Sequence, residues 1–460
     1  LLHWIDAEAS RDADDTLWQA NLPALRGLRL SCLLARHRAG PGLWPAAQWP
    51  RWDAGFDRHL RHLLGRLARD GAPASPLELH AVAMLLQHLD GSAARRYVEH
   101  RWKAAVQASL KSGFTAEGVL RLHSPAQQRS AVRAWSRCMA SGCFDDTALA
   151  TLFPAMRAAL RALRWPDGRP LPLGDADVQE AEARAPRGRE AASLTNWSGQ
   201  VLFLDRANAR LLHLMAGNRS TGALHDDGMS VLWHDGVALL TDPGRLASAP
   251  RAMQRHLRSS AARNTVSIDG RPAARGGQSN RMLAAEQTDG LVHIRTRKTD
   301  MRWPATHARH LWHRPGHWLL LLDVLTGRRA LDWTRWLHFG PDLVPDGPAQ
   351  WQLPDGRRLT VHSACVDPLH ETTVRGAQDP QPQGWLCTSD GLVPAWVTGH
   401  GVRAERTAIA TLLVLDDDGS RLDMQPDRRL RAEVRAGKTA DSLHVRWDLE
   451  SSHLERDGSG

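Results

Sequence analysis

The sequence has only one tyrosine, Tyr97, so only this residue could transfer a proton through a phenol group. Its aromatic residues are 19 Trp, 6 Phe and 1 Tyr. Tyr97 falls in an expected helix together with Arg95, Arg96 and Arg101. We predict a structural or surface role for this tyrosine. The many tryptophans offer flat faces that stack well on sugar rings, although a large share of them should lie in the core.

Cysteines and long apolar runs are also few. The five cysteines include no CxxC pair, which excludes a dense disulfide framework or a zinc ribbon. Cys138 and Cys143 are close enough in sequence to pair, and a reduced pair fits the spacing equally well. No uninterrupted run of about 18 apolar residues occurs, so no transmembrane segment is predicted. The first residue is Leu, so the lack of a visible signal peptide carries little weight.

Lysine is scarce, and the net charge of +9 comes almost entirely from arginine. Arginine favours flat, forked anions such as carboxylate, sulfate and phosphate. The charge therefore suggests a polyanionic partner, either an acidic polysaccharide or a nucleic acid, while a GC-rich genome would give the same composition without any such partner. No helix-turn-helix, zinc-finger or RNA-binding signature supports the nucleic-acid alternative.

Apolar residues recur at helical spacing through the first third of the chain. Turn sequences rich in Gly, Pro and Asp separate the periodic segments, which predicts about six helices joined by short loops. The expected helices cover residues 22–35, 56–68, 77–89, 98–110, 130–140 and 149–163. We therefore expect a helical domain over residues 1–185.

Residues 165–192 are rich in proline, alanine and charge, and they end the helical pattern. From residue 201 the apolar residues alternate with a period of two, which predicts strands. The expected strands are 201–204, 210–215, 229–233, 237–240, 264–268, 291–296, 317–325, 334–339 and 409–415. We expect a second domain, residues 190–460, built as an antiparallel β-sandwich or as stacked sheets.

The stretch from His225 to Asp269 places a histidine and several carboxylates near predicted strand ends. His225 and Asp242 could bind a metal, because imidazole and carboxylate together suit zinc. The alternative is structural: Asp227 would satisfy His225, and Asp242 would cap the Asp-Pro-Gly turn.

Several motifs of the chain resemble one known family in their order. They are His225-Asp-Asp227-Gly-Met-Ser230, Asp242-Pro-Gly244, Arg263-Asn-Thr-Val, Arg309 to Asp323, Trp336-Leu-His338-Phe, Trp18 to Arg26, Phe114 to Pro125 and Trp165 to Asp175. Together they are similar to the heparinase II/III-like proteins. The resemblance implies an incomplete α/α toroid followed by an antiparallel β-sandwich.

The resemblance also implies an activity. Active members are polysaccharide lyases that cleave uronate polymers by β-elimination. One group neutralises the uronate carboxylate, a base removes the C5 proton, and a Tyr or His protonates the leaving oxygen. Some members bind a structural zinc. Export in Gram-negative bacteria is typical of the family, which implies a periplasmic or envelope location.

The sequence departs from the family pattern at several positions. Gln127 stands where the catalytic Tyr is expected, and Gln cannot act as a proton donor at any useful pKa. Ser75-Pro76 replaces the usual Asn-His, and Ala223 replaces the first His of the usual His-x-His. The resemblance implies a zinc-binding histidine at the position of Arg263, and the arginine adds a positive charge there.

These comparisons give the following expected site. The catalytic candidates are His123, Gln127 and His225. The expected substrate-binding residues are Arg121, Arg219, Arg263 and Asn264, and the metal candidates are His225 and Asp242. No cofactor is required, although zinc is an option. The predicted partner is an acidic polysaccharide, and the protein is either an active lyase with a changed residue set or a catalytically silent glycan-binding relative.

Overall fold

The computed structural model divides into two compact units, and each is described here by itself. One contains residues up to Arg121 together with Gln128–Arg161, and the other contains Leu122–Gln127 and everything from Ala162 onward. The described residues are 18, 21–40, 44–67, 73–89, 93–122, 124–173, 192–197, 199–215, 229–270, 278–300, 304–379, 381–437, 439–448 and 452–455.

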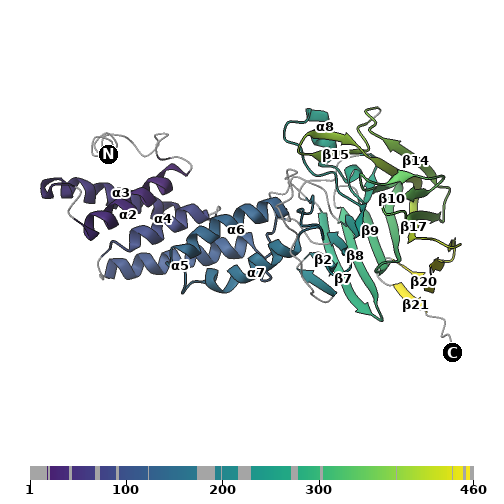
Figure 1. Cartoon of the computed structure of the whole chain (residues 1–460), viewed down its shortest axis with the longest axis horizontal. Helices are drawn as coiled ribbons and strands as arrows, with labels where there is room; N and C mark the ends of the chain where they lie inside the picture. Colours follow the sequence, from purple (N-terminus) through teal and green to yellow (C-terminus); the bar gives the residue numbers. More distant parts are fainter. Residues whose placement is uncertain are drawn as a thin grey trace. The chain divides into compact units, whose positions relative to one another are not determined.

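The first unit is helical (Figure 1). Its α-helices are α2 (Leu22–Ala39), α3 (Trp49–Leu67), α4 (Pro76–Leu86), α5 (Ala93–Gly113), α6 (Pro125–Ala140) and α7 (Ala148–Ala162), with the first residues of α6 grouped in the other unit. All six predicted helices are present, and most differ from prediction only by a few residues at their ends. No helix in the described part of the chain is both long enough and apolar enough to cross a lipid bilayer.

Local chemistry sets the start of α4. Ser75 accepts a hydrogen bond from the Glu78 amide, and the Glu78 carboxylate accepts one from the Ser75 amide, which together form a capping box. Arg66 of α3 forms an ion pair with the same carboxylate. Ser75-Pro76, which departs from the family pattern, therefore begins a helix. The five cysteines are all free thiols, so Cys138 and Cys143 do not pair.

The second unit consists of antiparallel sheets. A five-stranded sheet runs β1 (Ser193–Trp197), β2 (Gln200–Asp205), β3 (Arg210–Met215), β4 (Val231–Asp235) and β5 (Val237–Leu240) in spatial order. A four-stranded sheet is formed by β18 (Arg421–Gln425), β19 (Arg429–Ala436), β20 (Thr439–Trp447) and β21 (Ser452–Glu455). A short hairpin joins β15 (Trp385–Thr388) and β16 (Gly391–Pro394).

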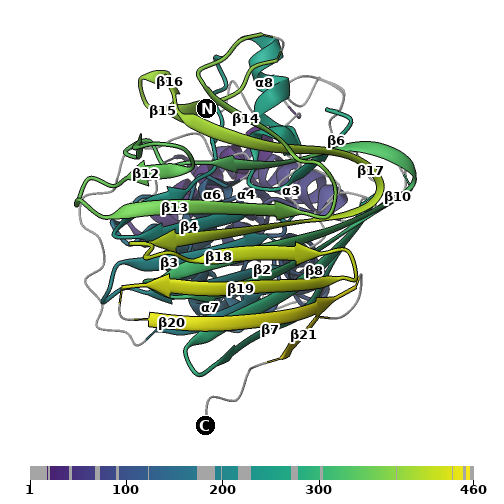
Figure 2. The same cartoon turned by 90° about the vertical axis from the view of Figure 1, so that its right-hand side faces the viewer.

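A ten-stranded sheet lies between the other two large sheets. It consists of β6 (Val266–Ile268), β7 (Gln278–Thr288), β8 (Leu291–Asp300), β9 (Ala305–Arg314), β10 (Trp318–His338), β11 (Val344–Pro345), β12 (Gln350–Gln352), β13 (Arg358–Cys365), β14 (His370–Arg375) and β17 (Trp396–Leu415). Figure 2 looks onto the four-stranded sheet, with β18, β19 and β20 in front. The helix α8 (Arg251–Leu257) and the 3₁₀ turn η3 (Ser260–Ala262) connect β5 to β6.

Alternating side chains of the central strands supply both cores. Leu319 and Leu321 of β10 pack against the five-stranded sheet, whereas Leu320 and Leu322 pack against the four-stranded sheet. Because both faces are buried, residues 318–325 are almost entirely apolar. The two strands predicted over 317–325 and 334–339 are parts of this one strand, which has a bulge between Thr326 and Leu331.

The segment after the last helix packs with the sheets. Leu163, Trp165, Leu171 and Leu173 form a core cluster with the outer face of the five-stranded sheet, including Leu202. The predicted boundary near residues 185–190 lies outside the described residues, while the change from helical to sheet packing falls at Ala162.

Candidate functional site

Three of the predicted site residues, His123, His225 and Arg219, lie outside the described residues. The described ones are found in two places. Arg121 and Gln127 flank His123 before and at the start of α6, and Asp242, Arg263 and Asn264 lie within the sandwich.

The loop before α6 is held by hydrogen bonds from the buried side chain of Gln128 to backbone groups. The Gln128 amide donates to the carbonyl oxygens of Gly118, at 2.8 Å, and Met156, and its oxygen accepts from the Leu120 N–H at 2.6 Å. Gly118 has a φ of +78°, and an added Cβ would lie 2.3 Å from the Met156 nitrogen. Gly118 and Gln128 therefore fix the path of the chain just before the predicted catalytic position His123.

Gln127 lies in the first turn of α6, and its side chain is half-buried. Its N–H donates to the hydroxyl of Ser124, which caps the helix. Arg121 is exposed, and its Nε donates to the Lys111 carbonyl at 3.3 Å. Tyr97 is 62% exposed and accepts a hydrogen bond from Arg101, which confirms its predicted surface role.

Asp242 and Arg263 form an ion pair inside the sandwich, and both side chains are 0% exposed. Asp242 Oδ1 also accepts a 2.9 Å hydrogen bond from the Gly244 N–H, so it caps the Asp-Pro-Gly turn. Arg263 Nη2 donates to the Leu257 carbonyl at 2.8 Å. The structural alternative, in which Asp242 caps the Asp-Pro-Gly turn, is thus confirmed. The expectation that Arg263 contacts a glycan is wrong, because its guanidinium is buried and paired with Asp242.

Asn264 links two sheets. Its side-chain amide donates to the carbonyls of Val231 (2.8 Å) and Thr241 (2.7 Å), on the five-stranded sheet and its continuation. Its Oδ1 accepts a 2.6 Å hydrogen bond from the His338 N–H at the end of β10. With the side chain buried and its amide used in this way, Asn264 also has a structural role in place of the predicted substrate contact.

Arg309 and Asp323 form a second buried ion pair beside Asn264. Arg309 Nη1 donates to the carbonyls of Met229 (2.6 Å) and Asn264 (2.7 Å). Burial alone would raise the pKa of Asp323, but Arg309 and His307 lower that pKa well below its ordinary value. Met229 directly follows the segment 216–228 that contains His225, so this pair holds one end of that predicted catalytic segment.

Two histidines near the Asp242–Arg263 pair are uncharged at neutral pH. Burial and the nearby Arg263 lower the pKa of His256 to about 4. Burial, then His256 and Arg263, lower the pKa of His338 to about 3. His338 Nε2 lies 3.1 Å from the Ala261 carbonyl, which can only accept, so this nitrogen carries the hydrogen.

Sequence reasoning assigned no role to these two histidines. The motif that contains His338 and the motif that contains Arg309 and Asp323 predict no partner for these side chains. His256 lies in a segment whose only visible signal was its basic charge. Their grouping depends on contacts between residues that are far apart in the sequence.

The described residues do not fit the zinc that the resemblance implies. The Asp242 carboxylate is paired with a guanidinium, and no group of three His, Cys, Asp or Glu side chains among the described residues could hold a metal. The other metal candidate, His225, lies outside those residues. We therefore derive no chemical step through a metal.

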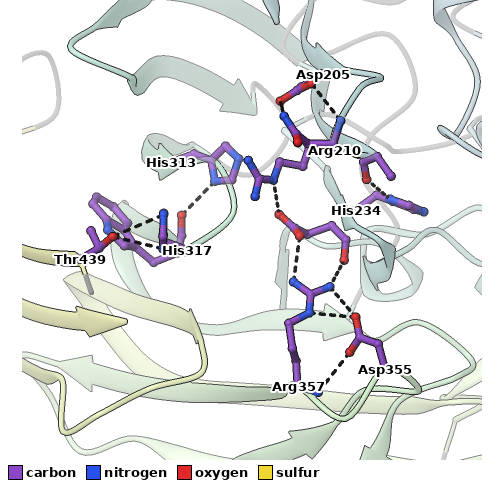
Figure 3. A network of polar contacts seen from close by, with 12 residues as sticks. Asp205, Arg210, His234, His313, His317, Asp355, Arg357 and Thr439 are labelled. Atoms are coloured by element: carbon purple, nitrogen blue, oxygen red, sulfur yellow. Dashed lines mark hydrogen bonds and ion pairs between the residues drawn. The ribbon is translucent and has the colours of Figure 1, made fainter. Parts of the chain in front are cut away.

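A further network joins turns of the sandwich (Figure 3). Asp235 accepts from Arg210 Nε at 3.1 Å and from Arg357 Nη1 at 2.9 Å. Arg357 also donates to Asp355. His317, on the turn between β9 and β10, lies 3.3 Å from the Thr439 hydroxyl. These arginines link β3, β4 and the turn before β13, so part of the basic charge serves the fold.

The order of elements and the buried motif residues define a polysaccharide-lyase fold. The family model for the heparinase II/III-like C-terminal domain matches residues 214–447, which is half of the chain. The protein therefore belongs to the heparinase II/III-like family.

Solved structures support the fold over nearly the whole chain. Heparan sulfate lyase HepC from Pedobacter heparinus matches with a TM-score of 0.73 at 13% identity, covering 98% of this chain and 79% of that one. A heparinase III structure matches with a TM-score of 0.69 at 11% identity, covering 96% and 79%. The predicted incomplete α/α toroid followed by a β-sandwich is confirmed. No curated protein sequence matches significantly.

Proposed function

We propose that this protein acts on a uronate-containing acidic polysaccharide by β-elimination. The observation that carries the proposal is membership of the heparinase II/III-like family, together with the likeness of 98% of the chain to a heparan sulfate lyase. The net charge of +9, mostly arginine, suits a polyanionic substrate. A periplasmic or envelope location would give access to such polymers.

The reaction requires a neutralised carboxylate and two proton transfers. A base takes the C5 proton, the C4–O bond breaks as the C4–C5 double bond forms, and the leaving oxygen is protonated. We assign the proton transfers to His123 and His225, since the Gln127 amide cannot supply a proton. Arg121 and Arg219 are the candidates for binding carboxylate or sulfate, because a guanidinium matches both. Arg121 is exposed and could make that contact.

The test is incubation of the full chain with heparan sulfate, alginate and polyglucuronate. The unsaturated product absorbs in the ultraviolet, and we expect this absorbance to rise with at least one polymer. His123→Ala and His225→Ala should each lower the rate by about 10²–10⁴-fold, the usual range for a general acid or base. Arg137→Met, an exposed change on α6, is the matched control and should leave the rate unchanged.

The second candidate is a catalytically silent protein that binds an acidic exopolysaccharide during its synthesis or export. It is favoured by Gln127, whose amide stands at the position expected for the catalytic Tyr. In that case calorimetry should detect binding of the same polymers without any unsaturated product. Failure to bind or cleave any acidic polymer, or a preference for DNA or RNA over them, would contradict both candidates.

A further inference from the structure

The Asp242 carboxylate is fully buried, and a buried carboxylate needs a partner of opposite charge. Arg263 supplies that charge from the position where the family resemblance implies a zinc-binding histidine. The same carboxylate oxygen also accepts the Gly244 N–H. Asp242 Oδ1 therefore receives both an ionic partner and a hydrogen-bond donor from the chain itself.

Arg263 is also tied to the local backbone. Its Nη2 donates to the carbonyl of Leu257, the last residue of α8, at 2.8 Å. The guanidinium thus connects the turn after β5 to the end of α8. A metal ion bound by side chains at strand ends would make the same kind of cross-link.

The surrounding charges disfavour an additional cation. Asp242 and Arg263 together are neutral, and His256 and His338 carry no charge at neutral pH because burial and Arg263 lower their pKa values. Counting the charges of these described residues, a divalent ion added here would leave two positive charges uncompensated in a buried site. Displacing Arg263 would instead leave its guanidinium without the ion pair.

We propose that the Arg263 guanidinium serves as the built-in counter-cation of Asp242, in the place of a structural metal, so that the sandwich folds and stays folded without zinc. The inference concerns the scaffold and holds whether or not the chain cleaves a polysaccharide. Its test therefore measures metal content and unfolding, and not activity.

The first experiment uses the full wild-type chain, purified, equilibrated with zinc chloride and dialysed. We expect less than about 0.1 zinc per chain by elemental analysis, since a buried ion pair already satisfies the site. We also expect the same unfolding temperature with and without EDTA. About one zinc per chain, with a fall in that temperature after chelation, would overturn the proposal.

The second experiment tests the pair through substitution. Arg263→Met leaves Asp242 buried without its counter-charge and should lower the unfolding temperature by on the order of 10 °C. Asp242→Asn/Arg263→Met removes both charges and should recover at least half of that loss. Arg251→Met, an exposed change on α8, is the control and should have no effect.

If Arg263→Met yields no folded protein, Asp242→Asn and the double variant still decide the question. Asp242→Asn should then unfold at a lower temperature than the double variant, because it leaves the Arg263 guanidinium buried without a counter-charge. Single variants that unfold at the wild-type temperature, or a double variant less stable than both singles, would contradict the assignment.

Discussion

Arg309 and Asp323 face each other across β9 and β10 and share two hydrogen bonds, Nε to Oδ1 at 2.7 Å and Nη2 to Oδ2 at 2.9 Å. Both side chains are fully buried. The pair lies in the middle layer of the sandwich, and through the carbonyls of Met229 and Asn264 it also holds the chain just before β4 and β6.

Breaking this pair should be far more costly than breaking an exposed one. Asp323→Asn leaves the Arg309 charge buried and should lower the free energy of unfolding by about 3–5 kcal/mol. Arg403→Met, which breaks the exposed pair of Arg403 with Asp332 between β10 and β17, should cost less than about 1 kcal/mol. Urea unfolding of the two variants measures the contrast. Equal losses would show that burial does not set the strength of the pair.

Asn264 should be sensitive to chemistry as well as to size. Asn264→Asp keeps the shape but loses the amide that donates to Val231 and Thr241, so their carbonyls face a carboxylate. We expect a loss of about 2–4 kcal/mol, because two buried acceptors lose their donor. Asn208→Ala, at an exposed turn, should cost under about 1 kcal/mol. Thermal unfolding of both variants checks this, and an unperturbed Asn264→Asp would refute the bridging role.

The buried His338 should make the sandwich less stable in acid. Its pKa is about 3 in the folded chain and about 6.5 when unfolded, so the unfolded state binds the extra proton first as the pH falls. The stability contributed by the neutral ring is complete above pH 6.5 and is lost between pH 6.5 and 3. By pH 5 the loss should be about 2 kcal/mol from this group.

The measurement compares urea unfolding at pH 7 and pH 5. His338→Asn should reduce the pH dependence of stability by about that 2 kcal/mol. His370→Asn, an exposed change on β14, should leave the pH dependence as in the wild type. A pH dependence that is the same in all three proteins would mean that His338 is not the group that titrates.

Gly118 should resist substitution because of space, and not only because of its backbone angle. Gly118→Ala would push a Cβ into the α7 backbone at Ala155 and Met156, whereas an added Cβ at Gly142 has open space around it. Both glycines have positive φ, near +78° and +71°. Gly142→Ala should cost about 1 kcal/mol of strain and Gly118→Ala distinctly more. Thermal unfolding of the two variants isolates the steric part.

The sequence predicted the helices of the first unit and the change to strands after them, but it missed β7, β9, β13 and every strand of the four-stranded sheet. Helical spacing located all six helices, and alternation matched β3 and β5 to the residue. The alternation pattern predicted two strands where the structure has the single strand β10, because residues 326–333 mix Arg, Asp and Gly with apolar residues. β19 was not predicted, although its buried residues alternate with exposed ones, because the arginines and glutamate between them obscure the pattern.

The candidate site was less predictable for a physical reason. A motif shows which residues occur together but not which of them are buried. Arg263 and Asn264 were interpreted as ligands for a glycan, whereas each is used by the chain itself, through Asp242 and through the backbone of two sheets. The lowered pKa of His338 depends in part on His256, which lies more than 80 positions away, and no local pattern encodes that proximity.

The pairing of β10 with β17 has a consequence for how the chain acquires its structure. These strands are separated by more than 50 residues, yet they form the centre of the sheet and contribute to both cores. Such distant pairing makes folding slow and leaves apolar strands uncovered in the meantime. During synthesis, the face of β10 that carries Leu320 and Leu322 stays uncovered until the four-stranded sheet has emerged, whereas Leu319 and Leu321 can already pack against the five-stranded sheet.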